Sequence, residues 1–263
     1  MAEISAGLVK ELRDQTGAGM MECKRALQET EGDVDAAVKL LREKGITQAA
    51  KRSGRETTEG KVALELGETV AAMVAVGCET EPVSNNEEFL IFVQRVLDRV
   101  FHDGPEGASE LEDERVELAA RLGENIVVQD AVRFEGEEND VLSGYVHPPA
   151  HKIGVLVHGR GKPDAARPLA MHISFAAPQY VTRADVPEAE VDAEREILAK
   201  QPDVASKPEE VRGKIVDGRI QKWLAERVLE EQEWIHDSSK KVGQALQEAG
   251  FEVIEFRRFA LSE

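Results

Sequence analysis

The sequence predicts an α+β protein: three short helices, then a core of two similar antiparallel sheet-plus-helix units, with an antiparallel helical hairpin inserted in the second unit. Apolar residues recur with a helical period in the first 45 residues and alternate with a period of two from residue 61. They become sparse in two charged, proline-bounded segments after residue 186. These observations predict domains at 1–53, 54–140, 141–184 with 235–263, and 185–234.

The N-terminal domain is expected to consist of three helices of roughly ten residues, which must pack together because each would be marginal alone. Residue types that start and stop helices mark their ends: the starts are Ser5, about Met20 and Asp33, and the stops are Gly17, Gly32 and Gly45. The segment from Thr47 to Glu59, rich in Lys, Arg, Thr and Gly, is expected to be a linker.

In the first unit of the core, residues 61–66 and 69–78 are expected to form two strands joined by a turn at Gly67-Glu68. The second strand is apolar on both faces, so it should be central and covered. Ser84 and Glu87 have the spacing of a capping box and predict the start of a helix. Its buried stripe is Phe89, Val93, Val96, Leu97 and Val100, and a helix near 111–122 and an apolar run at 126–134 complete the unit.

The second unit repeats this order weakly, which suggests a duplicated core. We expect strands at 144–147 and 152–158, a turn at Gly159-Arg160-Gly161, and a helix at 169–176. Charged helices at 187–200 and 208–233 are separated by prolines, so they should form an antiparallel hairpin that projects from the body. A helix that ends at Gly250 and a strand at 251–260, which returns to the second sheet, close the chain.

The charge of the chain is large and unevenly placed. The sequence has 33 basic and 51 acidic side chains, for a net charge of −18. Residues 1–52 hold nine of each sign, whereas residues 102–140 hold thirteen acids and three arginines. Such a chain is a poor match to a phosphate backbone, so we expect no direct nucleic-acid partner.

Cysteine usage and hydropathy indicate the compartment. Cys23 and Cys78 lie far apart, which argues against a disulfide framework or a zinc ribbon and suits a reducing environment. No apolar run reaches about 18 residues, and the first residues mix acids with bases. We therefore expect neither a membrane span nor a targeting peptide, and we expect a cytoplasmic protein.

Motifs of chemical catalysis are missing from the sequence. It contains no phosphate-loop, dinucleotide-binding, GxSxG or HExxH motif. His147 and His151 would suit a metal if they lay on a helix, but Pro148 and Pro149 interrupt that helix, so histidines at a strand end are the favoured interpretation. The sequence thus favours a binding protein without a metal or cofactor over an enzyme.

Two segments favour a contact with another protein. Residues 16–27 join two helices through a Gly-rich loop followed by two methionines, whose flexible thioethers can adapt to a partner; the alternative is a helix end with ordinary core methionines. Residues 78–89 form a polar loop between a covered strand and a helix. That loop could be a simple connection, but a loop held at both ends can also push residues into another protein.

These segments resemble those of bacterial elongation factor Ts, the nucleotide-exchange factor for elongation factor Tu. The matching motifs, spread over essentially the whole chain, are Leu8 to Arg13, Thr16 to Met21, Cys23-Lys24, Gly32-Asp33, Gly123 to Ile126, Ile153 to Val157, Ala170 to His172, Ser239-Lys240 and Val242 to Gln244. The resemblance implies a ubiquitin-associated (UBA)-like three-helix domain, a core of two similar subdomains, and an antiparallel coiled coil inserted in the second.

The resemblance also implies a function and a set of contact residues. The protein would bind elongation factor Tu, both GDP-bound and nucleotide-free, and promote GDP release without a chemical active site. The loop that disturbs the partner's magnesium ion and phosphate loop would be Thr80, Glu81, Pro82 and Val83. The other contacts would be Met20, Met21 and Lys24 in the helical domain, Arg52 in the linker, and Leu122 and His147 in the core.

At the loop, the sequence departs from the family. The usual pair is Asp then Phe, whereas this chain has Glu81 then Pro82 and so lacks the aromatic wedge. Either another group, such as Phe89, supplies the push, or the protein relies more on its remaining contacts. The competing hypotheses are a UBA-type protein-binding adaptor without exchange activity, and an enzyme that acts near His147, which requires a concave polar pocket there.

Overall fold

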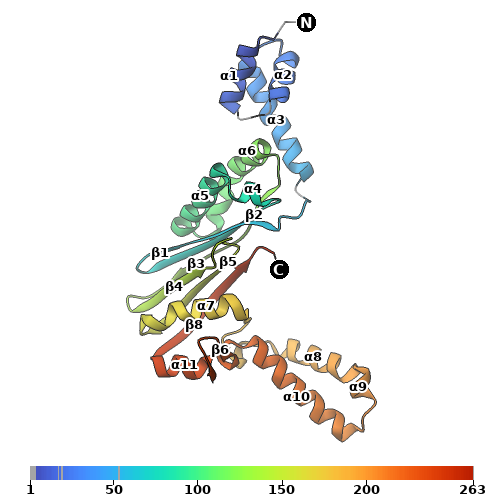
Figure 1. Ribbon diagram of the computed structural model, residues 1–263, viewed down its shortest axis with the longest axis vertical. Helices are drawn as coiled ribbons and strands as arrows, with labels where there is room; N and C mark the ends of the chain where they lie inside the picture. Colours follow the sequence, from blue (N-terminus) through green and yellow to red (C-terminus); the bar gives the residue numbers. More distant parts are fainter. Residues whose placement is uncertain (1–3, 17, 19, 53, 263) are drawn as a thin grey trace.

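The computed structural model describes residues 4–16, 18, 20–52 and 54–262, and for residues 45–52 it describes only the helical backbone. The molecule is elongated, with the three N-terminal helices at one end, two small sheets in the middle and a helical hairpin at the other end (Figure 1). The architecture is mixed α+β with antiparallel sheets, as the sequence predicts. Among the described residues, no helix combines the length and apolar character needed to cross a membrane.

The N-terminal helices are α1 (Ala6–Thr16), α2 (Met20–Glu29) and α3 (Val34–Arg52), and they bury a small core of their own. The Asp33 carboxylate accepts a hydrogen bond from the amide of Ala36 at 2.9 Å, which confirms the predicted cap of α3. The predicted stop at Gly45 is wrong, and so is the start of the predicted linker at Thr47, because α3 continues to Arg52; residues 54–58 connect it to the first sheet. An interior glycine costs a helix only about 1 kcal/mol, and no proline follows to end it. The predicted stop at Gly17 falls outside the described residues.

The first sheet contains β1 (Glu59–Leu66), β2 (Val70–Cys78) and β3 (Ile126–Glu135), all antiparallel in the order β1-β2-β3. Strand β2 is central and buried along almost its whole length, as its two apolar faces predict. The amide of Gly67 donates to the carbonyl of Val70 at 2.8 Å, so the two-residue turn is Glu68-Thr69, one residue later than predicted.

Helices cover the outer face of this sheet. They are α4 (Glu81–Ser84), α5 (Glu87–Asp103), the 3-10 turn η1 (Pro105–Leu111) and α6 (Glu112–Leu122). The predicted buried stripe of α5 lies in the core beneath it. The predicted capping box is wrong: Asn86 caps α5 by accepting from the amide of Glu88 at 2.8 Å, whereas the Ser84 hydroxyl donates to the Glu81 carbonyl within α4.

The second sheet repeats the first. It contains β4 (Asp140–Val146), β5 (Ile153–Gly161) and β8 (Phe251–Ala260) in the order β4-β5-β8. Two helices cover it, α7 (Ala166–Ala176) and α11 (Val242–Ala249), and the 3-10 turn η2 (Pro163–Ala165) precedes α7. Both sheets therefore consist of two strands, helices and a third strand, with the second strand central. The predicted turn at 159–161 is wrong, because these residues extend β5 and pair with β8.

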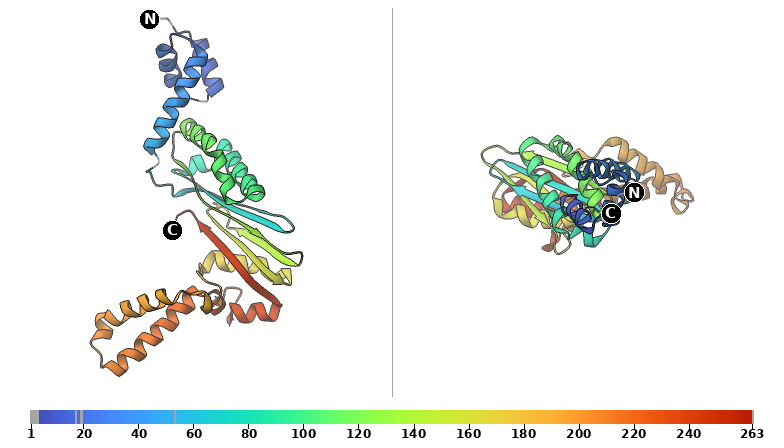
Figure 2. Two further views of the ribbon diagram at one scale, coloured as in Figure 1. Left: turned by 180° about the vertical axis from the view of Figure 1, so that it is seen from behind. Right: turned by 90° about the horizontal axis from the view of Figure 1, so that it is seen from above.

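The two sheets pack face to face between their helices (Figure 2). The shared apolar layer includes Ala71, Met73 and Ala75 of β2 against Leu156 of β5 and Phe259 of β8. Close approach requires Gly154, because a Cβ built there would lie 2.3 Å from Cγ1 of Val62. Strand β2 is thus covered by helices on one face and by the second sheet on the other.

The inserted hairpin consists of α8 (Glu188–Lys200), the single-turn helix α9 (Pro202–Ala205) and α10 (Glu209–Arg227), preceded by the 3-10 turn η3 (Arg183–Asp185). It projects from the second sheet, as predicted (Figures 1 and 2), and has an apolar cluster of its own. Helix α10 ends at Arg227 rather than near residue 233. The 3-10 turn η4 (Leu229–Glu231) and a small hairpin of β6 (Glu233–Trp234) and β7 (Asp237–Lys241), which the sequence pattern did not predict, follow it.

The base of the hairpin is closed by hydrogen bonds. Tyr180 and Val228 form an isolated parallel bridge. Gln232 donates through its side-chain nitrogen to the carbonyl of Ala176 at the end of α7 and to the carbonyl of Glu226 near the end of α10. Its oxygen faces Nε2 of the fully buried His172 at 2.9 Å, so this nitrogen is the donor. One side chain thereby joins the ends of two helices.

Candidate partner-binding surface

The predicted loop at residues 80–83 is a single helical turn at the end of the most buried strand. Residues 79–85, here named the α4 segment, leave β2 directly after Cys78 and carry α4. Glu81 and Pro82 are exposed, whereas Val83 is half-buried against the first core. Pro82 lies in the first turn of α4, where its missing amide hydrogen costs no helical hydrogen bond.

The entry to the α4 segment is held by Glu124. One oxygen of its carboxylate accepts from the amides of Glu79 at 3.1 Å and Thr80 at 3.0 Å, and the other accepts from the Thr80 hydroxyl at 2.5 Å. In the opposite direction, the Glu79 carboxylate accepts from the amide of Asn125 at 2.6 Å and pairs with Arg55 at 3.3 Å. The end of β2 and the start of β3 are therefore locked together.

The exit from the α4 segment is held by Lys61, a buried lysine on β1. Its ammonium donates to the side-chain oxygen of Asn85 at 3.0 Å and to the carbonyl of Ala150 at 3.0 Å. Ala150 belongs to the turn that carries His147. One charged group thus connects the α4 segment to that turn.

The predicted core contacts lie around this segment. Leu122 is the last residue of α6, two positions before Glu124, and it is half-buried against the first core. His147 is exposed at the end of β4, and its Nδ1 is 3.0 Å from the Tyr145 hydroxyl. Leu122 therefore lies two residues before the side chain that holds the entry of the α4 segment, and Lys61 joins the turn of His147 to its exit.

The predicted contacts of the helical domain lie apart from the α4 segment. Met20, Met21 and Lys24 are exposed on α2, with 55% and 64% of the two methionines accessible. This agrees with the contact-surface interpretation and not with ordinary core methionines. Arg52 ends α3, and its side chain falls outside the described residues.

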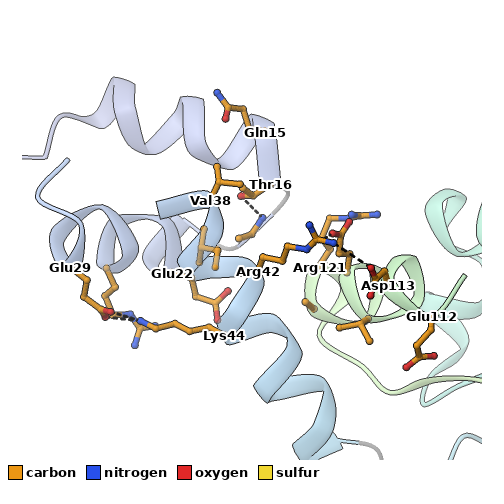
Figure 3. Close-up of a pocket in the computed structure, with 16 residues that line it drawn as sticks. Gln15, Thr16, Glu22, Glu29, Val38, Arg42, Lys44, Glu112, Asp113 and Arg121 are labelled. Carbon is orange, nitrogen blue, oxygen red and sulfur yellow. Dashed lines mark hydrogen bonds and ion pairs between the residues drawn. The ribbon is translucent and has the colours of Figure 1, made fainter. Parts of the chain in front are cut away.

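A groove of about 580 Å³ separates the helical domain from α6, and the sequence pattern did not predict it. Its walls carry Glu22 and Arg42 on one side and Asp113 and Arg121 on the other (Figure 3). Arg42 crosses it and pairs with Asp113 at 3.6 Å and with Glu117 at 3.1 Å. The groove therefore lies between the helical domain and the core, and it is lined by charged side chains from both.

Phe89 cannot replace the missing aromatic wedge, because its side chain is fully buried under α5. The exposed apolar residues on that helix are its neighbours Leu90 and Ile91, with 42% and 54% of their surfaces accessible. Of the two alternatives left open by the sequence, the structure removes Phe89 as the source of the push.

The reactive and metal-ligating groups that the structure describes near the α4 segment are few. Burial raises the pKa of the Cys78 thiol to about 12, so this cysteine is not a thiolate at neutral pH. Among the described residues, no group of three or more His, Cys, Asp or Glu side chains could hold a metal ion. What the site offers is one rigid helical turn, exposed side chains and hydrogen-bonding groups.

Fold and site together define a mixed α+β protein built from two like sheet units, with helical extensions at both ends and one rigidly held exposed turn between them. The sequence model described as Elongation factor TS matches residues 79–263. The protein named Elongation factor Ts from Thioalkalivibrio sulfidiphilus is 41% identical over 273 aligned positions, covering 99% of this chain and 92% of the relative. That of Rhodospirillum centenum is 40% identical over 290 positions, covering 100% and 94%.

A more divergent relative, the Elongation factor Ts of Lactiplantibacillus plantarum, is 35% identical over 273 positions, covering 100% of this chain and 94% of the relative. The chain belongs to the elongation factor Ts family, a family of translation elongation factors.

Proposed function

We propose that this protein is the guanine-nucleotide exchange factor of elongation factor Tu. It binds the GDP-bound partner, disturbs the partner's magnesium and phosphate site, and promotes GDP release; GTP then dissolves the complex. It performs no covalent chemistry, needs no cofactor, acts in the cytoplasm, and engages neither membrane nor nucleic acid directly.

The observation that carries this proposal is the α4 segment, an exposed turn anchored at both ends. A single helical turn has little stability of its own, so its shape depends on its anchors. Glu124 fixes its entry and Lys61 its exit; Glu124 lies two residues before β3, and Lys61 is a buried residue of β1. A turn held in this way can transmit force to a partner instead of yielding.

The energetic requirement is modest for an interface made of several parts. Each tenfold acceleration of GDP release requires a barrier lower by about 1.4 kcal/mol. Contacts through Thr80, Glu81, Pro82 and Val83 would deform the nucleotide site. Contacts through Met20, Met21, Lys24, Arg52, Leu122 and His147 would supply binding energy. Because the coupling is reciprocal, nucleotide weakens the complex by the same factor.

The parts of the chain take separate roles in this proposal. Residues 1–53 form the UBA-like domain that grips the nucleotide-binding domain of elongation factor Tu, and residues 54–140 form the core subdomain that carries the α4 segment. Residues 141–184 with 235–263 form the second subdomain, and residues 185–234 form the coiled-coil insertion. The separate apolar clusters of the helical domain and of the hairpin support this division.

The test is the release of fluorescent GDP from purified elongation factor Tu. Stimulated release at micromolar protein supports the proposal, and the double variant Met20→Ala with Met21→Ala should need a higher concentration for half-maximal stimulation. Ile197→Ala, which removes an equally exposed apolar side chain on α8, is the matched control. Binding without stimulated release would favour the adaptor hypothesis instead.

The departure at Pro82 is tested in the same assay. Pro82→Phe restores the family's aromatic residue at an exposed position in the first turn of α4, so the fold should tolerate it. If the aromatic wedge limits exchange, this variant should release GDP faster than the unmodified protein. An unchanged or lower rate would show that the remaining contacts suffice.

A further inference from the structure

We propose that Glu124 is the positioning residue of exchange: it holds the α4 segment in the conformation that acts on the partner, without touching the partner itself. This inference rests on the proposed exchange function and adds a specific residue to it. The carboxylate belongs to the connection between α6 and β3, outside the α4 segment.

The hydrogen bonds of Glu124 match its chemistry. An ionised carboxylate only accepts hydrogen bonds, and the three groups that face it are donors: the amides of Glu79 and Thr80 and the Thr80 hydroxyl. Bonds to a charged acceptor are about twice as strong as neutral ones. One side chain therefore fixes both the backbone and the side chain at the entry to α4.

Glu124 is itself placed by its neighbours. Gly123 ends α6 in the left-handed conformation, with φ of 78°, and its amide donates to the Ala119 carbonyl at 3.0 Å. Asn125, on the other side, is buried and donates through its side chain to the Arg55 carbonyl at 2.9 Å. The carboxylate is thus held between a fixed helix end and a buried asparagine.

The bonding at this junction is reciprocal. Glu124 accepts from the amide of Glu79, and Glu79 accepts from the amide of Asn125. Directly beyond this exchange, Cys78 pairs with Ile126 across the sheet. The α4 segment is therefore fixed relative to Cys78 and Ile126, the pair of β2 and β3 next to this junction.

The role should be visible in exchange more than in folding. Thr80 is exposed, so water can reach the amides when the carboxylate is removed, and the buried core beneath them keeps its own contacts. Lys61 would still hold the exit of the segment. The segment would then be anchored at one end only, and contact with the partner would bend it rather than deform the nucleotide site.

The experiment compares three variants of the full chain in the GDP-release assay. Glu124→Ala should lower the maximal stimulated rate by about tenfold, with the half-saturating concentration changed by less than about threefold. Glu124→Gln should stay within about threefold of the unmodified protein, because its amide oxygen can accept from both backbone amides and its nitrogen can donate to the Thr80 hydroxyl. Glu114→Ala removes a half-buried carboxylate of α6 that pairs with Arg95 at 3.0 Å, and it should behave as wild type.

Hydrogen exchange supplies a readout that does not depend on activity. In Glu124→Ala, the amides of residues 79 and 80 should exchange at least about tenfold faster, while the amides of β2 keep their protection. Faster exchange throughout β2, with rate and affinity lost together, would show a merely structural role and overturn the inference. So would a Glu124→Ala protein with a wild-type maximal rate. If the unmodified protein itself fails to stimulate release, the proposed function is the statement that has failed.

Discussion

Adding one methyl group at two glycines should change stability in opposite directions. At Gly154, a Cβ would lie 2.3 Å from Cγ1 of Val62 and 3.0 Å from Sδ of Met73. Ordinary carbon contacts are about 3.5–4.0 Å, so the valine must retreat by about 1.2 Å. Valine is stiff at χ1 and lies on β1, so the two sheets must separate locally. Overpacking of this kind typically costs 1–3 kcal/mol, and we expect about 2–3 kcal/mol for Gly154→Ala.

The matched control is Gly213→Ala in the second turn of α10. No atom lies within 4 Å of a Cβ built there, so the methyl group meets open space. Alanine is favoured over glycine in a helix interior by about 0.5–1 kcal/mol, so this variant should be more stable. Urea titrations of both variants give the free energies of unfolding. A loss of less than about 0.5 kcal/mol at Gly154 would refute the tight face-to-face packing of the sheets.

Three further predictions concern the helices. Asn86→Ala should cost about 1 kcal/mol in a urea titration, because it removes the cap of α5, and Asn86→Ser should restore most of the loss. Burial lowers the pKa of His172 below its ordinary 6.5, so the unfolded chain binds the proton more readily than the folded chain. The free energy of unfolding should therefore fall as the pH drops below 6.5, and it should fall less in His172→Gln. An equal pH dependence in the two proteins would contradict this prediction. Ile220→Ala should destabilise the hairpin by about 2–5 kcal/mol and speed its proteolysis at residues 200–211, without changing amide hydrogen exchange in β2. An equal loss of protection in the hairpin and in β2 would show that the hairpin is not a separate unit.

The strongly periodic elements are those that the sequence predicts best. Strand β2 shows this, because a run that is apolar on both faces can be stable only when both faces are covered, and the helices and the second sheet cover them. Helix α11 and strand β8 follow their predicted ranges for the same reason, with Gly250 at φ of 70° between them. In these elements the local pattern and the tertiary burial agree.

The errors arise where single residues were used as signals. Gly45 does not end α3, and Gly159 and Gly161 continue a strand, because a glycine permits a break without requiring one. Ser84 does not cap α5, because it is the last residue of α4, and Asn86 caps α5 instead. A helix of four residues is too short to show a periodicity in the sequence. In each case the residue type permits an end or a cap without fixing where it falls.

The candidate site was only partly visible in the sequence. The sequence predicts a loop held at both ends at residues 78–89. It does not predict which side chains hold the loop, because Glu124 contacts residues 44 and 45 positions earlier and no local pattern encodes that distance. The available signal is a glutamate that directly follows a helix-ending glycine and lies two residues before the buried Ile126 at the start of β3. The signal for Lys61 is a lysine next to the apolar alternation of β1, where it lies between the buried Gly60 and Val62.

The closed base of the hairpin has a consequence for how this protein can vary in size. The chain leaves the second unit and returns to it at one point, where Tyr180 and Val228 pair and Gln232 joins α7 to α10. Helix α10 has 19 residues and so spans about 28 Å. Each residue added to both long helices would move the tip outward by about 1.5 Å and leave every strand register unchanged. The length of the hairpin can therefore change without any change in the fold that carries it.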